Sequence, residues 1–165
     1  MCSACMYGKA TRKAWRRRNK DNTDEDVKPK QPGELVLVDQ LISPTPVFIA
    51  HMCGILTTKR YTCATVYVDQ ASKLGFVWIQ KKMAAKDMVN GKKSFEKYAR
   101  DRGVQIQHYH ADNGIFKIKA WVLDCQLSRQ RITYAGVGAH HQNGVAERRI
   151  RVLQDLTRTQ LILAK

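Results

Sequence analysis

Three carboxylates in this 165-residue sequence stand where separate structural elements could bring them together. Asp39 lies near the end of an apolar run, Asp112 directly follows a strand-like run, and Glu147 lies in the first turns of a helical stretch. Converging acids repel one another until a cation binds between them. Carboxylate oxygens suit Mg²⁺, and two such ions about 3.5–4 Å apart can activate the attacking oxygen and stabilise the leaving oxygen of a phosphoryl transfer.

The spacing of the acidic residues along the sequence leaves two alternatives to this interpretation open. Any three of the 14 Asp and Glu residues can be surface groups or strand-end caps. Asp69 also competes with Asp39 for the first position, because it too ends a strand-like run. Its other possible role is that of a turn residue.

Hydrophobic patterns predict the elements that must position these acids. Five strands are expected at residues 34–41, 61–69, 75–80, 104–110 and 131–135. Three helices are expected at residues 83–102, 116–130 and 143–164. Pro44 and Pro46 are expected to end the first strand, and the second and third strands to form an antiparallel hairpin. This order predicts an α/β fold with a mixed five-stranded sheet flanked by helices.

Two helices carry more specific expectations. Gly91 weakens the prediction of helix 83–102, because glycine is a poor helix former. In the last helix, apolar or small residues spaced by three and four predict the buried face. They are Ala146, Ile150, Leu153, Thr157 and Leu161.

The charge balance predicts a polyanionic partner. The chain has 29 Lys and Arg residues against 14 Asp and Glu, a net charge of +15. A basic run from Lys9 to Lys20 and the acidic patch after it are typical of a linker, yet residues 31–165 still hold 20 basic and 10 acidic residues. Because Lys and Arg contacts with phosphates release counterions, this surplus favours nucleic acid.

Other protein classes fit poorly. The apolar runs are too short to cross a bilayer, and the first residues show no secretory signal. Five cysteines without a regular spacing do not predict a disulfide scaffold. Cys53, Cys63 and Cys125 are expected as small core residues.

Three short motifs favour the interpretation that the three carboxylates bind metal ions. They are Val38-Asp39-Gln40, His110-Ala111-Asp112-Asn113-Gly114 and His141-Gln142-Asn143-Gly144-Val145-Ala146-Glu147-Arg148. In order, they resemble the three acidic motifs of the integrase core of copia-type LTR retrotransposons. Residues 61–78 also resemble the second and third strands of that core, so the similarity covers about residues 31–165.

The resemblance implies an RNase H-like fold and a DDE polynucleotidyl transferase. Asp39, Asp112 and Glu147 would then be the catalytic acids that hold Mg²⁺ or Mn²⁺. Asp39 is preferred over Asp69, because Asp69 falls where the family continues its hairpin. The implied reactions are trimming of the 3′ ends of the element DNA and strand transfer into target DNA.

The resemblance also implies a nucleic-acid surface around the last helix. Arg151 and Gln154 lie one and two turns beyond Glu147 on the same face. Asn143 is expected to cap the helix, where free amides favour an anion. The residues expected to contact DNA are Gln142, Asn143, Arg148, Arg151 and Gln154.

The ends of the chain suggest a fragment. Cys2 and Cys5 form half of a zinc site, and in the similar family such a pair ends a His-His-Cys-Cys domain; zinc is expected here only if the missing ligands are supplied. Residues 1–30 are therefore interpreted as the end of that domain plus a linker. Residues 31–165 are interpreted as a catalytic core truncated after the helix of the third acid.

Two further functions remain alternatives: an RNase H-like nuclease that cuts without joining, and a truncated nucleic-acid-binding remnant without catalysis. For the integrase, the expected partners are element and target DNA and further copies of the chain, with no membrane. The resemblance implies a nuclear location after a cytoplasmic stage of the parent element.

Overall fold

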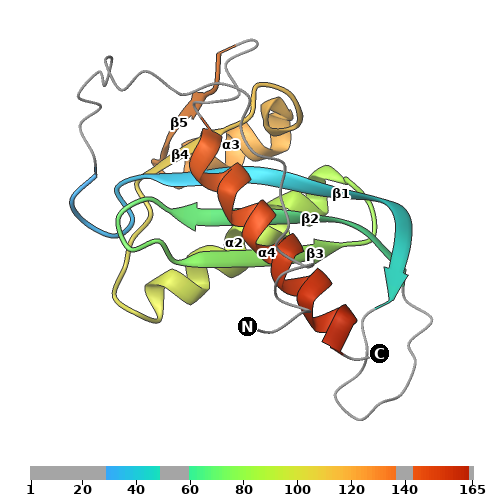
Figure 1. Cartoon of the computed structure of the whole chain (residues 1–165). Coiled ribbons are helices and arrows are strands. Elements are labelled where there is room, and N and C mark those ends of the chain that lie inside the picture. Colours follow the sequence, from blue (N-terminus) through green and yellow to red (C-terminus); the bar gives the residue numbers. More distant parts are fainter. Residues whose placement is uncertain (1–28, 49–59, 137–142, 164–165) are drawn as a thin grey trace.

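The computed structural model describes residues 29–48, 60–136 and 143–163. Its strands form one five-stranded sheet in the order β3-β2-β1-β4-β5 (Figure 1). They are β1 (Val36–Phe48), β2 (Arg60–Asp69), β3 (Gly75–Gln80), β4 (His108–Ala111) and β5 (Arg131–Tyr134). β1, β2 and β3 pair antiparallel, whereas β1, β4 and β5 pair parallel. The predicted mixed five-stranded sheet is confirmed.

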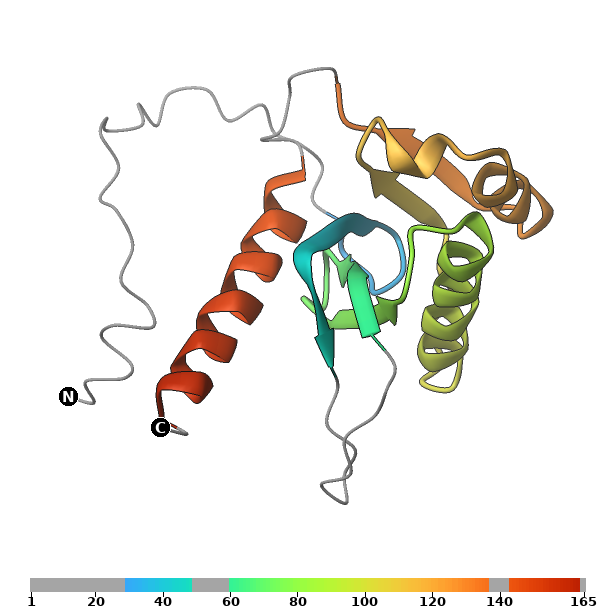
Figure 2. The ribbon, with the colours of Figure 1, turned by 90° about the vertical axis from the view of Figure 1, so that its right-hand side faces the viewer.

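Helices cover both faces of this sheet. They are α2 (Ala85–Arg100), α3 (Lys119–Leu127), which follows the short 3₁₀ helix η1 (Ile115–Lys117), and α4 (Gly144–Leu163). Alternate β1 side chains point to opposite faces, so Val36 and Val38 pack with α2 and α3, while Leu37 packs with α4. Figure 2 shows α4 on one side of the strands and α2 on the other. Among the described residues, no helix is both long and apolar enough to span a membrane.

β1 is longer than predicted. It continues past Pro44 and Pro46 to Phe48, and the pairing with β2 shifts register between Ile42 and Val47. The pairing of β1 with β4 ends at Val38, so the later part of β1 has only one partner strand. A proline that lacks an N–H is tolerated in such an edge, and the expectation that the two prolines end the strand is therefore wrong.

The predicted helix 116–130 is interrupted. Ile118, between η1 and α3, has an extended backbone with φ −61° and ψ 129°. Phe116 and Trp121 are both 1% exposed, and their rings lie 5.3 Å apart. Five positions along a continuous helix turn the side chains about 140° apart, so one helix could not bury both rings on one face. Because the helix is broken at Ile118, both rings can be buried in the core.

One predicted strand and the predicted buried face of the last helix are shorter than expected. The strand expected at 104–110 is formed only by β4, residues 108–111. In α4, Ala146 is buried and Ile150 and Leu153 are partly buried, but Leu161 is 64% exposed. Thr157 is also exposed. The buried face of α4 is therefore mainly its first half.

Gly91 has a packing role in α2. A Cβ at this position would lie 2.6 Å from Cδ1 of Trp78 on β3. We expect Gly91→Ala to lower the free energy of unfolding by roughly 1–3 kcal/mol, although alanine is the better helix former. Urea unfolding measures this. Gly144→Ala is the control, because a Cβ added at this position would have no atom within 4 Å. Equal stability of the two variants would contradict the packing role of Gly91.

A buried ion cluster joins α2 to α3 and β4. The Lys92 side chain is fully buried, and its Nζ lies 2.6 Å from Asp124 Oδ2 and 2.9 Å from Glu96 Oε1. Glu96 Oε1 also accepts hydrogen bonds from the Tyr109 hydroxyl and the Gln130 amide. Burial opposes the charge of Lys92, but the bonds to Asp124 and Glu96 outweigh it and raise the pKa of Lys92.

The same cluster predicts a loss of stability in acid. Burial raises the pKa of Asp124, but Lys92 and then Lys93 outweigh it and lower that pKa overall. The stabilisation from Asp124 is therefore present above about pH 4, the ordinary carboxyl pKa, and is lost as pH falls through the lower folded value. We expect the stability difference between wild type and Asp124→Asn, measured by urea unfolding, to shrink between pH 6 and pH 3. A constant difference would contradict this.

Candidate active site

Asp39 and Asp112 lie side by side where two parallel strands separate. β1 and β4 pair from Val36 with Tyr109 to Val38 with Ala111, so the next position on each strand is an aspartate. The strand that follows β1 in sequence, β2, lies on one side of this pair, and the strand that follows β4, β5, lies on the other side. Such a switch point leaves a crevice at the carboxyl ends of the strands. Asp39 thus lies inside the long β1, beside its fork with β4, rather than near the strand's end as predicted.

Each aspartate uses one oxygen in a local hydrogen bond. Asp39 Oδ1 accepts from the backbone N–H of Gln40 at 2.8 Å, and Asp112 Oδ1 accepts from that of Asn113 at 2.8 Å. Within the described ranges, the second oxygen of each accepts no hydrogen bond. Both carboxylates therefore keep an oxygen for a ligand.

Glu147 lies on α4, and its charge acts on Asp39. It is the fourth residue of the helix, as the sequence predicted. Burial raises the pKa of the Asp39 carboxyl, the Gln40 hydrogen bond opposes this, and the charges of Glu147 and then Asp112 raise it further. The three acids therefore share one electrostatic environment around Asp39.

The fold has relatives among solved structures. No protein-family profile matches the chain, and no curated protein sequence does. The HTLV-2 integrase catalytic core domain, in complex with magnesium, is 17% identical with a TM-score of 0.55, over 79% of this chain and 73% of that one. The chain has the RNase H-like fold of an integrase catalytic core.

Two further structures with the integrase-core fold agree. The simian T-cell lymphotropic virus intasome, in complex with PP2A regulatory subunit B56 gamma, is 15% identical with a TM-score of 0.56, over 73% of this chain and 38% of that one. The BIV integrase catalytic core is 17% identical with a TM-score of 0.52, over 74% and 68%. At these identities the similarity establishes the fold alone.

The three acids fit a divalent cation by their chemistry. They offer only hard oxygen ligands. Burial is the main cause of the raised pKa of Asp39, and the charges of Glu147 and Asp112 add to it; a cation would offset that added repulsion. In the ranges that the structure describes, no three His, Cys, Asp or Glu side chains lie close enough to hold one ion as they stand. Asp112 and Glu147 are exposed and Asp39 is half-buried, so binding of one ion by all three would require side-chain movement.

Asp69, the rival of Asp39, has a structural role in this integrase-core fold. It is 3% exposed and pairs with Val36, three positions before Asp39. Its Oδ1 accepts from the Gly33 N–H at 2.9 Å, and its Oδ2 accepts from the N–H and hydroxyl of Ser72 at 2.7 and 2.6 Å. Both oxygens are used, so Asp69 is the turn residue that the sequence offered as its alternative.

The predicted DNA-contacting residues divide into two groups. Arg148, Arg151 and Gln154 are exposed on α4, and neither arginine has a carboxylate partner among the described residues. Asn143, in contrast, is 4% exposed and donates from Nδ2 to the Val38 carbonyl at 3.2 Å. Its Oδ1 has no hydrogen-bond partner. Asn143 therefore makes no capping hydrogen bond through its oxygen, and its predicted contact with DNA stays a prediction.

Several predictions fall outside the described residues. Gln142, the half zinc site of Cys2 and Cys5, and Cys53 belong to this group. Cys63 and Cys125 are both buried, as expected of core residues. Burial raises the pKa of the Cys125 thiol to about 12.

The burial of Lys92 and the shared hydrogen-bond partner of two histidines were not predicted from the sequence. Lys92 resembles any other lysine of an amphipathic helix, and no local signal predicts its burial. His108 and His110 share the Thr133 hydroxyl, at 2.8 and 2.9 Å. Their alternation on one strand could have indicated a common face.

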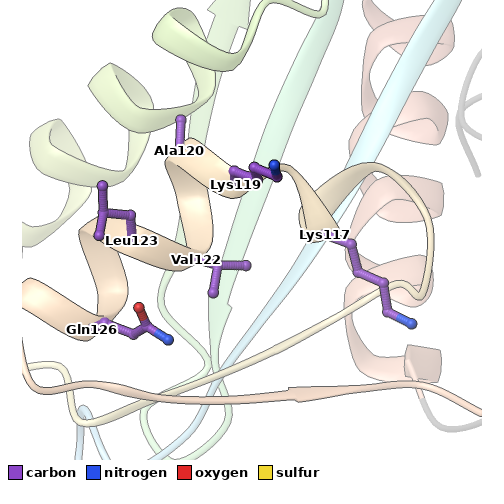
Figure 3. Close-up of a pocket in the computed structure, with 6 residues that line it drawn as sticks. All are labelled: Lys117, Lys119, Ala120, Val122, Leu123 and Gln126. Atoms are coloured by element: carbon purple, nitrogen blue, oxygen red, sulfur yellow. The ribbon is translucent and has the colours of Figure 1, made fainter.

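A cavity of about 510 Å³ lies along η1 and α3 (Figure 3). Among the described residues, its lining is Lys117, Lys119, Ala120, Val122, Leu123 and Gln126. None of these side chains is a carboxylate, so this cavity offers no oxyanion ligand for a cation. The fork between β1 and β4 remains the candidate active site.

Proposed function

We propose that this chain is the catalytic core of a DNA integrase from a copia-type retrotransposon, and that it trims the 3′ ends of the element DNA and joins them to target DNA. One observation carries the proposal: Asp39 and Asp112 occupy adjacent register positions at the strand fork, and the charge of Glu147 acts on Asp39. The integrase-core fold and the three sequence motifs support it.

Asp39, Asp112 and Glu147 would hold Mg²⁺ or Mn²⁺. When bound, such ions supply Lewis acidity at the phosphoryl group and neutralise its developing charge. The carboxylates fix the position at which a nucleophilic oxygen and the phosphorus meet in line, and no covalent bond to the protein is required. The HTLV-2 core, solved in complex with magnesium, supports this choice of metal.

The α4 surface would bind the DNA strand beside these acids. Arg151 and Gln154 follow Glu147 at four and seven positions, on one helix face, and all three are exposed. Arg148 adds a second cation without a described carboxylate partner. The net charge of +15 favours a polyanion as partner.

Self-association and nuclear entry complete the proposal. The HTLV-2 core has been solved in dimeric and trimeric forms, which supports an assembly of several copies here. An enzyme that joins DNA to chromosomes must reach the nucleus, and the basic run from Lys9 to Lys20 is a candidate import signal. The half zinc site of Cys2 and Cys5 would need ligands from another segment or molecule.

A joining assay on a branched DNA substrate with Mn²⁺ tests the reaction. The integrase proposal predicts that the free 3′-hydroxyl beside the branch attacks the phosphodiester at the branch point. This joins the target strand, releases the branch strand with its own 3′-hydroxyl, and depends on the metal. Cleavage without joining would instead indicate an RNase H-like nuclease. DNA binding without any metal-dependent product would indicate a non-catalytic nucleic-acid-binding remnant, and either result would overturn the proposal.

Arg151→Glu should weaken DNA binding and lower its salt dependence. Loss of one phosphate contact reduces the slope of log affinity against log salt by about 1. Fluorescence anisotropy at several salt concentrations measures this. Lys97→Glu is the control, because Lys97 is exposed on α2, on the opposite face of the sheet. Equal losses in both variants would contradict a specific role for α4.

A further inference from the structure

Asn143 connects the start of α4 to the strand that carries Asp39. Its side-chain amide donates to the carbonyl of Val38 at 3.2 Å, across 105 positions of sequence. Val38 is the last β1 residue paired with β4 and immediately precedes Asp39. The hydrogen bond is therefore made one peptide away from the first carboxylate of the candidate site.

Helix geometry relates the same residue to the third carboxylate. Glu147 lies four positions after Asn143, one turn further along the same helix face. Any change in the position of the helix start relative to β1 therefore also moves Glu147 relative to Asp39.

Apolar packing alone does not fix that placement. α4 contacts the sheet through Ala146, which packs with Leu37, Val66 and Val68, and through the partly buried Val145, Ile150 and Leu153. Such burial stabilises the contact but has no direction, so it tolerates small shifts of the helix along its axis. The bond from Asn143 to the Val38 carbonyl is directional and fixes the register of the two elements.

We propose that Asn143 is a positioning residue, which sets the register of α4 against β1 and thereby places Glu147 for cation binding with Asp39 and Asp112. This inference rests on the proposed metal-dependent function. It assigns Asn143 a role within the protein, which the sequence did not indicate.

The unpaired oxygen of Asn143 makes a clean substitution possible. Its Oδ1 is buried without a hydrogen-bond partner, so Asn143→Leu breaks one bond and also removes one unsatisfied acceptor. These effects oppose each other in the stability of the fold. We expect the thermal midpoint without metal to stay nearly unchanged, whereas a purely structural residue would lower it.

The first readout uses the metal-free full chain. Amide hydrogen exchange should become faster in the first turns of α4 in Asn143→Leu, because the helix start has lost its directional bond. Thr159→Val is the control, since Thr159 is buried and its hydroxyl bonds within α4, to the Asp155 carbonyl at 2.8 Å. Unchanged exchange in Asn143→Leu would overturn the inference, whatever the metal does.

The second readout is a Mn²⁺ titration of the thermal midpoint for wild type, Asn143→Leu, Glu147→Gln and the double variant. Asn143→Leu should weaken Mn²⁺ binding roughly tenfold, as for other residues that orient ligands. The double variant should bind no more weakly than Glu147→Gln alone, because both changes act through Glu147. Wild-type affinity in Asn143→Leu, or fully independent effects, would overturn the inference.

The two failures are distinguishable. Absence of any Mn²⁺ response in the wild type would overturn the proposed function and with it this inference. A wild-type response that Asn143→Leu retains would overturn the inference alone. If Asn143→Leu does not fold, Asn143→Ala removes the same donor, and the same results are expected of it.

Discussion

Asp112→Asn is expected to abolish most of the stabilisation that Mn²⁺ gives to the chain. A ligand that binds only the folded state at 100 times its Kd stabilises by about 2.7 kcal/mol, a midpoint rise of roughly 5–10 °C for a domain of this size. The amide oxygen of asparagine can still accept the Asn113 N–H at Oδ1, so the turn is preserved. The anionic ligand is lost, and with it the rise.

Differential scanning fluorimetry of the full chain with and without Mn²⁺ measures this effect. Asp69→Asn is the matched control, because Asp69 is buried and both of its oxygens accept hydrogen bonds. We expect it to lower the metal-free stability by roughly 1–3 kcal/mol but to keep the Mn²⁺-dependent rise. A rise that survives in Asp112→Asn would exclude Asp112 as a ligand.

Lys92→Met should cause the largest loss of stability among the changes considered. Methionine replaces the aliphatic part of the side chain but leaves Glu96 and Asp124 without the cation between them. Their side chains are only 11% and 14% exposed, so water compensates little. Removal of one partner from a buried ion pair costs roughly 3–5 kcal/mol.

Lys93→Met provides the comparison for this prediction. Lys93 also pairs with Asp124, at 3.3 Å, but its side chain is 63% exposed. Exposed pairs contribute less than about 1 kcal/mol. Urea unfolding at neutral pH compares the two variants, and similar small losses in both would mean that the buried cluster does not hold α2 and α3 together.

Most of the architecture could be predicted from the sequence, because its signals are local. Strand-like runs of apolar and β-branched residues indicated β2 and β3, and the turn between Asp69 and Gly75 indicated their hairpin. The two aspartates were selected through motifs around Asp39 and Asp112, and the structure places them directly after Val38 and Ala111, the last paired residues of β1 and β4. Their catalytic role stays a prediction.

The failures concern properties that depend on residues far apart in the sequence. The pairing of β1 with β4 stops at Val38, and only this shows why Pro44 and Pro46 do not end the strand. Lys92 is buried because Asp124, 32 positions later, approaches it. Asn143 was expected to cap α4 and border DNA, and no signal in the sequence indicates its partner, the Val38 carbonyl.

The most direct test of a metal-dependent active site is anomalous diffraction from crystals of the full chain grown with Mn²⁺. We expect a manganese peak at the fork of β1 and β4, coordinated by Asp39 and Asp112, with Glu147 rotated toward it. A peak elsewhere, or a folded chain with no manganese at this fork, would contradict a metal site formed by these three acids.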